Sequence, residues 1–298
     1  MLIKSRYLNE KRIIIIYYSI FAVTTNVSFA NEKHTLVFGA GITHNRPDNI
    51  FYKGEPIYIH AGIRRTDSID ISQEETLKIG DVNAPWYGNI DIKYYKLEKT
   101  SDDMQQFKKV LMRNVKMELL FGSTINELKK ANESSSTTWV YEPNLTSAFL
   151  PGKYIVDITL NENRLKQYKP NISVKYLSNA IEIEIQEPNN NQEKSEVILN
   201  QGAFYSSKNK QEAAIKLFRQ ALELDPSKQK IHCNIGRSCE LDGDIDNAIK
   251  EYQIYVDWVH SLDIPRTGGD DINLHADTIE NNIKILEQVK NKKEKLSD

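Results

Sequence analysis

The feature that most constrains this chain is a residue pattern that occurs twice between Ser195 and Val259. A glycine, an alanine and an aromatic residue each recur at a spacing of 34 residues. A fixed period of this length indicates a repeated supersecondary unit, which buries its apolar face against the next unit. The matched pairs are Gly202 and Gly236, Ala214 and Ala248, and Phe218 and Tyr252.

Each copy is predicted to form two antiparallel helices. The paired glycines and alanines are small enough to let two helix backbones approach closely, and the aromatic residues fill the space around the crossing. Lys208-Asn209 in the first copy and Asp242-Gly243 in the second mark the turns, because Asn and Gly tolerate a left-handed backbone at a helix end. Asp225-Pro226 ends the second helix of the first copy.

This pattern resembles the tetratricopeptide repeat, with copies at about 195–228 and 229–262. The resemblance implies that the first helix of each copy lines a concave face that binds another polypeptide. Asn200 and Asn234 fall at one equivalent position, where an amide can clasp a peptide backbone. The alternative is that these are solvated helix positions. The protein-binding residues that the resemblance implies are Leu199, Asn200, Ala203, Lys230, Cys233, Asn234 and Arg237.

Beyond the second copy, residues 264–271 interrupt the pattern with Pro, Gly and Asp. Apolar residues then recur at helical spacing, which predicts a capping helix at about 272–290 inside a repeat domain of 193–298. Repeat arrays usually need about three units. We therefore expect this short stack to dock on the preceding domain or on a second copy of the chain, as a homodimer.

Residues 1–30 are predicted to be a signal peptide. Basic residues precede an apolar run, Ile13 to Val23, and Ser28-Phe29-Ala30 has the form of a cleavage site. The run is shorter than the roughly 20 residues that a membrane span needs, so no span is expected in the mature chain. The mature chain would be exported to the periplasm or the extracellular side of an envelope. The segment carries four Lys or Arg residues and one acidic residue, so the mature chain would have a net charge of −2 − 3 = −5, and general nucleic-acid binding is not expected.

Residues 31–188 change to a period of two, typical of strands with one buried face. The strands are expected around Ile57–Ile63, Ile90–Tyr94, Thr137–Tyr141, Tyr154–Leu160 and Ile181–Ile185. His60 is expected on a solvent face, and a helical turn is expected at 125–131. The turn phrases Tyr52 to Ile57 and Leu150 to Tyr154 resemble bacterial immunoglobulin-like or fibronectin-like modules. The fold class is therefore an antiparallel β-sandwich, a linker at 189–192, and an α-helical repeat domain.

No catalytic motif, metal-ligand spacing or cofactor loop is present in the sequence, so no catalytic residue, metal or cofactor is predicted. The segment Asp242-Gly-Asp244-Ile-Asp246 begins like a calcium loop but lacks its later Gly and Glu. The turn between paired helices explains it better, with Asp244 or Asp246 as the N-cap. Cys233 and Cys239 lie in one predicted helix and cannot pair there. The alternative for Cys233 is an intermolecular disulfide after export.

The favoured function is an exported, non-enzymatic adaptor that binds protein partners through the repeats. The alternative is an envelope protein whose sandwich binds a glycan or other cell-surface ligand, with the repeats as a tether. A glycan site would need an exposed aromatic platform, for which Trp86 and Tyr87 are the candidates, or Trp139 and Tyr141; core packing is the competing role for each pair. An enzyme with a site assembled from distant residues is the third interpretation.

Overall fold

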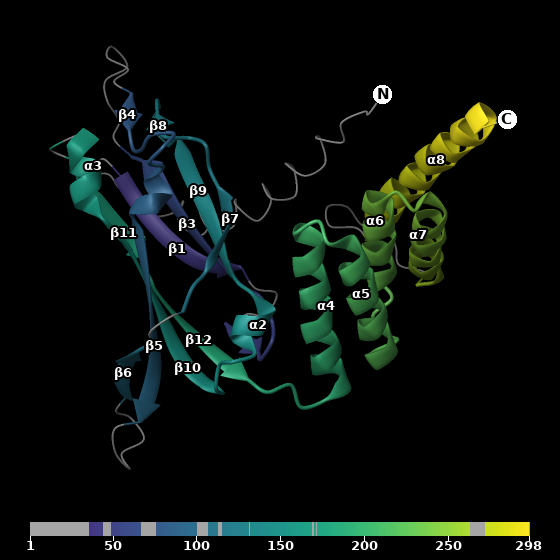
Figure 1. The fold of residues 1–298 in the computed structure, drawn as a ribbon, viewed down its shortest axis with the longest axis horizontal. Coiled ribbons are helices and arrows are strands. Elements are labelled where there is room, and N and C mark those ends of the chain that lie inside the picture. The colour runs from purple at the N-terminus through teal and green to yellow at the C-terminus, as the bar shows by residue number, and fades with distance from the viewer. Residues whose placement is uncertain are drawn as a thin grey trace. The chain divides into compact units, whose positions relative to one another are not determined.

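The computed structural model describes residues 36–43, 49–66, 76–99, 107–112, 115–130, 132–168, 170, 172–262 and 272–297 of the 298. Contacts divide the chain into two compact units. The first is built from strands and the second from helices (Figure 1). Two short segments, 52–56 and 146–148, belong to the second unit together with residues 187–298. The predicted signal peptide lies outside the described residues.

One five-stranded sheet of the first unit has the order β11-β1-β3-β9-β7. β3 pairs antiparallel with both β1 and β9, whereas β11 runs parallel to β1. The alternating stretches predicted at Ile57–Ile63 and Thr137–Tyr141 are confirmed as β3 and β9. The bounds are β1, Leu36–Thr43; β3, Ile57–Arg65; β7, Glu118–Gly122; β9, Ser134–Tyr141; and β11, Val174–Ser178.

A second five-stranded sheet has the order β2-β12-β10-β5-β6. β10 lies at its centre and pairs antiparallel with β12 and β5. The three remaining predicted strands are confirmed here as β5, β10 and β12. The bounds are β2, Ile50–Tyr52; β5, Ile90–Lys99; β6, Phe107–Leu111; β10, Gly152–Leu160; and β12, Ala180–Gln186.

The two sheets share one hydrophobic core, to which both contribute their inward-facing residues. Tyr94 of β5 and Tyr141 of β9 meet edge to face across it, with ring centroids 4.8 Å apart. A two-stranded sheet joins β4 (Leu77–Lys78) to β8 (Glu127–Leu128), so the helical turn predicted at 125–131 is wrong. The short helices are η1 (Trp86–Asn89), α2 (Pro143–Thr146) and α3 (Glu162–Tyr168).

The prediction that His60 faces solvent is also wrong, since its side chain is buried. His60 lies on the central strand β3 directly opposite Thr138 of β9, and its Nδ1 atom is 2.7 Å from the Thr138 hydroxyl. Burial lowers the pKa of His60 from 6.5 to about 4. The alternation of apolar residues predicted the strand correctly. It did not predict that the opposite face of the strand, which carries His60, is also buried.

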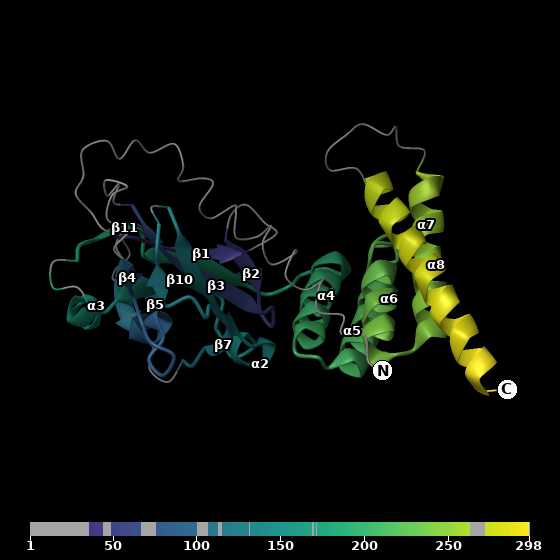
Figure 2. The same cartoon turned by 90° about the horizontal axis from the view of Figure 1, so that it is seen from above.

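The described residues of the second unit form five helices, which lie side by side in Figure 2. Their arrangement in sequence matches the predicted two hairpins and capping helix. Consecutive helices pack on each other from α4 through α8. The bounds are α4, Asn191–Ser207; α5, Gln211–Leu224; α6, Ile231–Asp242; α7, Ile245–Ser261; and α8, Ile272–Ser297.

The helix ends follow the predicted turn chemistry. Asn209 and Gly243 both have positive φ, 59° and 86° respectively, at the two hairpin turns. The side chain of Asp244 caps α7 by accepting from the backbone N–H of Asn247. The predicted linker at 189–192 is shorter than expected, because α4 already begins at Asn191 with Asn190 as its N-cap. The capping helix α8 continues beyond the predicted residue 290.

Candidate protein-binding surface

A pocket of about 340 Å³ opens on the helical unit where α4, α6 and α7 come close to the segment between α5 and α6. We call it the α4/α6 pocket. It brings together three of the residues predicted to bind protein, namely Leu199, Lys230 and Asn234. Five further residues line it: Ser227, Lys228, Gln229, Ile231 and Trp258.

The repeat arrangement explains why these residues meet. Leu199 lies on α4 and Asn234 on α6, the first helices of the two copies. α7 packs against α6, and Trp258 lies near the end of α7. The Trp258 ring packs against Tyr255 with centroids 5.9 Å apart, and the Tyr255 hydroxyl lies 2.7 Å from His275 Nδ1 on α8. The packing of α7 on α6 and α8 therefore positions Trp258 at the pocket.

Trp258 was not among the predicted site residues. It lies on α7, the second helix of its copy, whereas the resemblance to the repeat family implies binding residues on the first helices only. Its signal in the sequence is weak, because Trp258 follows Tyr252 and Tyr255 in the same helix, and both of those are core residues. Its side chain is only partly buried, so part of the ring remains available to a ligand.

The charged residues that line the α4/α6 pocket are basic. Lys228 and Lys230 line it, and none of the described lining residues is Asp or Glu. Asp225, two residues before Ser227, is buried and accepts from the backbone N–H and the hydroxyl of Ser227, whereas the exposed Asp257 directly precedes Trp258 outside the lining. The positive end of the α6 dipole adds to the field, and the first turn of α6 contains no acidic residue.

Asn200 and Asn234 lie at equivalent repeat positions on α4 and α6, but their surroundings differ. Within the second unit, the Asn200 amide donates to Glu55 Oε1 at 2.7 Å, and the neighbouring Gln201 amide donates to the Gly54 carbonyl at 2.9 Å. Asn200 therefore has an intramolecular partner where the prediction placed a ligand backbone. Asn234, in contrast, is exposed at the pocket.

The other predicted residues lie outside the pocket lining. Ala203 is exposed on α4 and Arg237 is partly buried on α6. Cys233 is partly buried and Cys239 is buried, and neither forms a disulfide. Burial, and then the nearby Asp244, raises the pKa of Cys239 to about 11.

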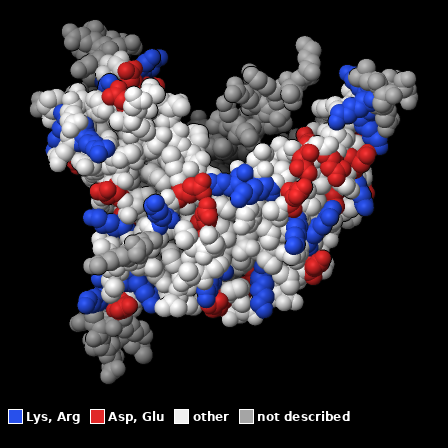
Figure 3. Space-filling view, viewed as in Figure 1, with Lys and Arg blue, Asp and Glu red and all other residues white. Residues whose placement is uncertain are grey.

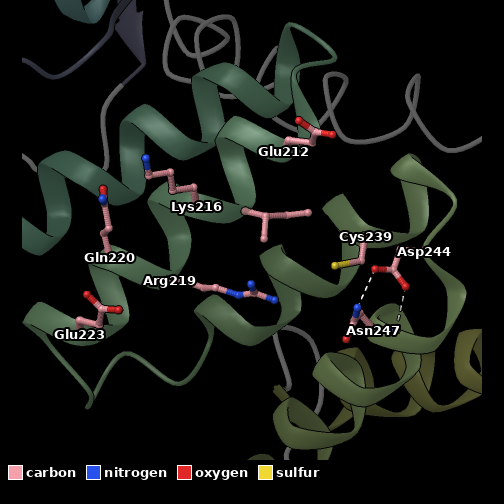
Figure 4. A pocket seen from close by; sticks show the side chains of 9 residues that line it. Glu212, Lys216, Arg219, Gln220, Glu223, Cys239, Asp244 and Asn247 are labelled. Atoms are coloured by element: carbon pink, nitrogen blue, oxygen red, sulfur yellow. Dashed lines mark hydrogen bonds between the residues drawn. The ribbon is translucent and has the colours of Figure 1, made fainter.

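A second pocket, of about 530 Å³, lies between α5 and the α6–α7 turn (Figure 4). Its charges are mixed: Lys216 and Arg219 lie beside three acidic residues. In Figure 4 the Asp244 carboxylate is held by Asn247, whose amide donates to it at 2.6 Å. Because its lining carries charges of both signs, this groove favours neither an anionic nor a cationic ligand. Its acidic residues are Glu212, Glu223 and Asp244.

Over the whole drawn face, acidic and basic side chains both appear, and neither sign covers that face alone (Figure 3). Among the described residues, no cluster of three or more His, Cys, Asp or Glu side chains is placed to hold a metal ion. None of the helices in the described part of the chain combines the length and apolar character that crossing a membrane requires.

The proposed aromatic platform on the β unit is wrong. Trp86 is fully buried, and its indole N–H donates to the Ser135 hydroxyl at 2.7 Å. The Tyr87 ring is partly buried and lies against Gly122, with no room there even for a methyl group. The alternative pair, Trp139 and Tyr141, is buried as well. Core packing explains Trp86, Trp139 and Tyr141, because their side chains are buried.

Comparison with known proteins supports the repeat. The family model described as "TPR repeat" matches residues 202–238, which run from the first copy into the second. Together with the two helical hairpins in sequence, this makes the C-terminal unit a tetratricopeptide-repeat domain. No curated protein matches the chain.

Solved structures resemble parts of the chain only distantly. The TPR domain of Sgt2 from Aspergillus fumigatus is 19% identical at a TM-score of 0.25, over 32% of this chain and 59% of that one. A β-glucosidase from Listeria innocua in complex with glucose is 13% identical at a TM-score of 0.21, over 50% of this chain and 16% of that one. At these scores neither likeness supports a conclusion about function.

Proposed function

We propose that this protein is an exported, non-enzymatic adaptor that binds a polypeptide partner in the α4/α6 pocket. One observation carries the proposal. Residues from the first helices of both repeats, Leu199 and Asn234, converge on a single open pocket with Trp258 from a third helix. Tetratricopeptide-repeat domains are interaction modules, so an open pocket on such a domain supports partner binding rather than catalysis.

The pocket has the composition of a recognition site. Its apolar side chains give a ligand contact area, while the Asn234 amide can donate to and accept from a peptide backbone at once. Aromatic residues such as Trp258 contribute disproportionately to binding energy at protein interfaces. The alternative of a glycan-binding sandwich with the repeats as a tether is not favoured, because Trp86, Trp139 and Tyr141 are buried and Tyr87 is only partly exposed.

A peptide-display selection on the purified protein tests this function. Peptides enriched on the wild type are remeasured on a Leu199→Ser/Asn234→Ala variant and on a control, Glu212→Ala/Asn247→Ala, which alters the other groove. We expect at least a tenfold loss of affinity in the first variant and none in the control. A selection that enriches nothing, or only peptides indifferent to both variants, would contradict the proposal.

Export is supported by the basic start, apolar run and cleavage motif of residues 1–30. Fusing this segment to an alkaline phosphatase that is active only outside the cytoplasm tests it directly. We expect activity from the fusion, and its loss when Ile14 and Ile16 are changed to Asp. Equal activity of the two fusions would contradict export by this segment.

A further inference from the structure

We propose that the α4/α6 pocket recognises a bulky apolar side chain in an acidic peptide segment, with carboxylates on either side of that side chain. This rests on the proposed function and names the chemistry of its partner. The pocket commits to one kind of occupant, because its floor is apolar and its rim is positive.

The floor comes from Leu199, Ile231 and Trp258. Ile231 is buried, whereas Leu199 and Trp258 are only partly buried and leave apolar surface open. An aliphatic or aromatic side chain entering here removes apolar area from water on both partners, which is the main favourable term in association. A polar side chain would gain nothing from these walls and would lose its own hydration.

The rim comes from Lys228 and Lys230. Lys230 is exposed and makes no ion pair or hydrogen bond through its side chain in the described part of the chain. Among the described residues, the Lys228 ammonium donates one hydrogen bond, to the Gln192 carbonyl at 3.3 Å, and so keeps donors for a carboxylate. With no Asp or Glu in the lining, a basic peptide meets like charge and no counter-charge.

Two groups remain to orient a peptide backbone between these contacts. Asn234 is exposed and makes no side-chain hydrogen bond to the described residues. The indole N–H of Trp258 likewise has no acceptor among them. The mixed-charge groove of Figure 4 offers no such combination, because three carboxylates line it.

Three fluorescein-labelled, capped nine-residue peptides test the proposal. The first carries a leucine flanked on each side by two acidic residues and then glycines; the second replaces the leucine with serine; the third replaces the acidic residues with lysines. Fluorescence anisotropy on the full protein should give an affinity at least tenfold higher for the first peptide. That affinity should fall as salt rises, since exposed charges are screened.

Matched variants separate charge from folding. Lys228→Ala/Lys230→Ala should weaken the acidic leucine peptide by about tenfold, whereas Lys216→Ala/Lys250→Ala, an equal change of charge on other exposed lysines, should leave it unchanged. Asn234→Asp, a near-isosteric exposed change, should also weaken it. Quenching or a shift of tryptophan emission on binding should vanish in Trp258→Phe.

Equal affinity for the acidic and basic peptides, or equal weakening by the two lysine pairs, overturns the proposal. Its failure is distinguishable from failure of the proposed function. If display selection enriches basic or purely polar peptides that need Leu199 and Asn234, the adaptor function stands and the acidic preference falls. If selection enriches no peptide that depends on this face, the function itself falls.

Discussion

Gly202 lies so close to the ring of Phe218 that a methyl group on it would be 2.6 Å from the ring atom Cε1. The second copy repeats the relationship, since a methyl on Gly236 would be 2.6 Å from Cδ1 of Tyr252. In each hairpin an aromatic ring of the second helix therefore rests on the bare backbone of the first. This contact sets how closely the paired helices approach, and through it the positions of Leu199 and Asn234.

Gly202→Ala is expected to destabilise the helical unit by about 1–2 kcal/mol. Overpacking a tight core costs roughly 1–3 kcal/mol, and the better helix propensity of Ala returns up to about 1 kcal/mol. Urea unfolding followed by helical circular dichroism measures the change. Adding Phe218→Leu should make the double variant less destabilised than the sum of the single changes. A more stable Gly202→Ala protein would contradict the contact.

Glu240→Ala is expected to lower the free energy of unfolding by about 1–3 kcal/mol, because the Glu240 carboxylate links α6 to both α7 and α8 through hydrogen bonds. Glu240 Oε2 accepts from the Tyr252 hydroxyl at 2.7 Å and from the Asn282 amide at 2.9 Å. Burial raises the pKa of Tyr252 above its usual value, so the phenol stays a donor. Removing the carboxylate leaves a buried hydroxyl unsatisfied. Glu212→Ala, an exposed change, should shift the unfolding midpoint little; equal effects of the two would refute the assignment.

Acid is expected to destabilise the β unit through His60. Because its pKa is lowered from 6.5 to about 4 in the folded state, the unfolded chain binds the proton first as the pH falls. The free energy of unfolding should therefore drop between pH 6.5 and 4, by up to about 3 kcal/mol from this group. His60→Gln should unfold with a shallower pH dependence over that window, measured by denaturant titration. Identical slopes for the two proteins would exclude His60 as the source.

The two cysteines are expected to differ sharply towards a thiol reagent. Cys239 is buried, and its pKa is raised to about 11, so little thiolate forms at pH 8. Cys233 is only partly buried. Mass spectrometry after brief maleimide treatment should find one label, lost in Cys233→Ser and doubled in urea. Rapid labelling of Cys239 in the folded protein would contradict its burial.

The local features of the fold were predictable because they depend on short-range constraints. A 34-residue spacing determined the hairpins, Asn209 and Gly243 determined their turns, and alternation identified the strands around Ile57 and Tyr154. Each of these signals reflects the conformational preference of a few neighbouring residues. That preference does not depend on distant parts of the chain, so the sequence alone is enough to predict it.

The sequence by itself determined that two helical hairpins would form, and it placed Leu199 and Asn234 on their first helices, with Lys230 at the start of the second of these. Only the tertiary structure decided that Trp258 completes their pocket, that Asn200 is held by Glu55, and that Trp86 and His60 are buried. Burial and pocket formation depend on which distant segments pack together. Residue periodicity specifies which face of an element is apolar, but not what covers the other face.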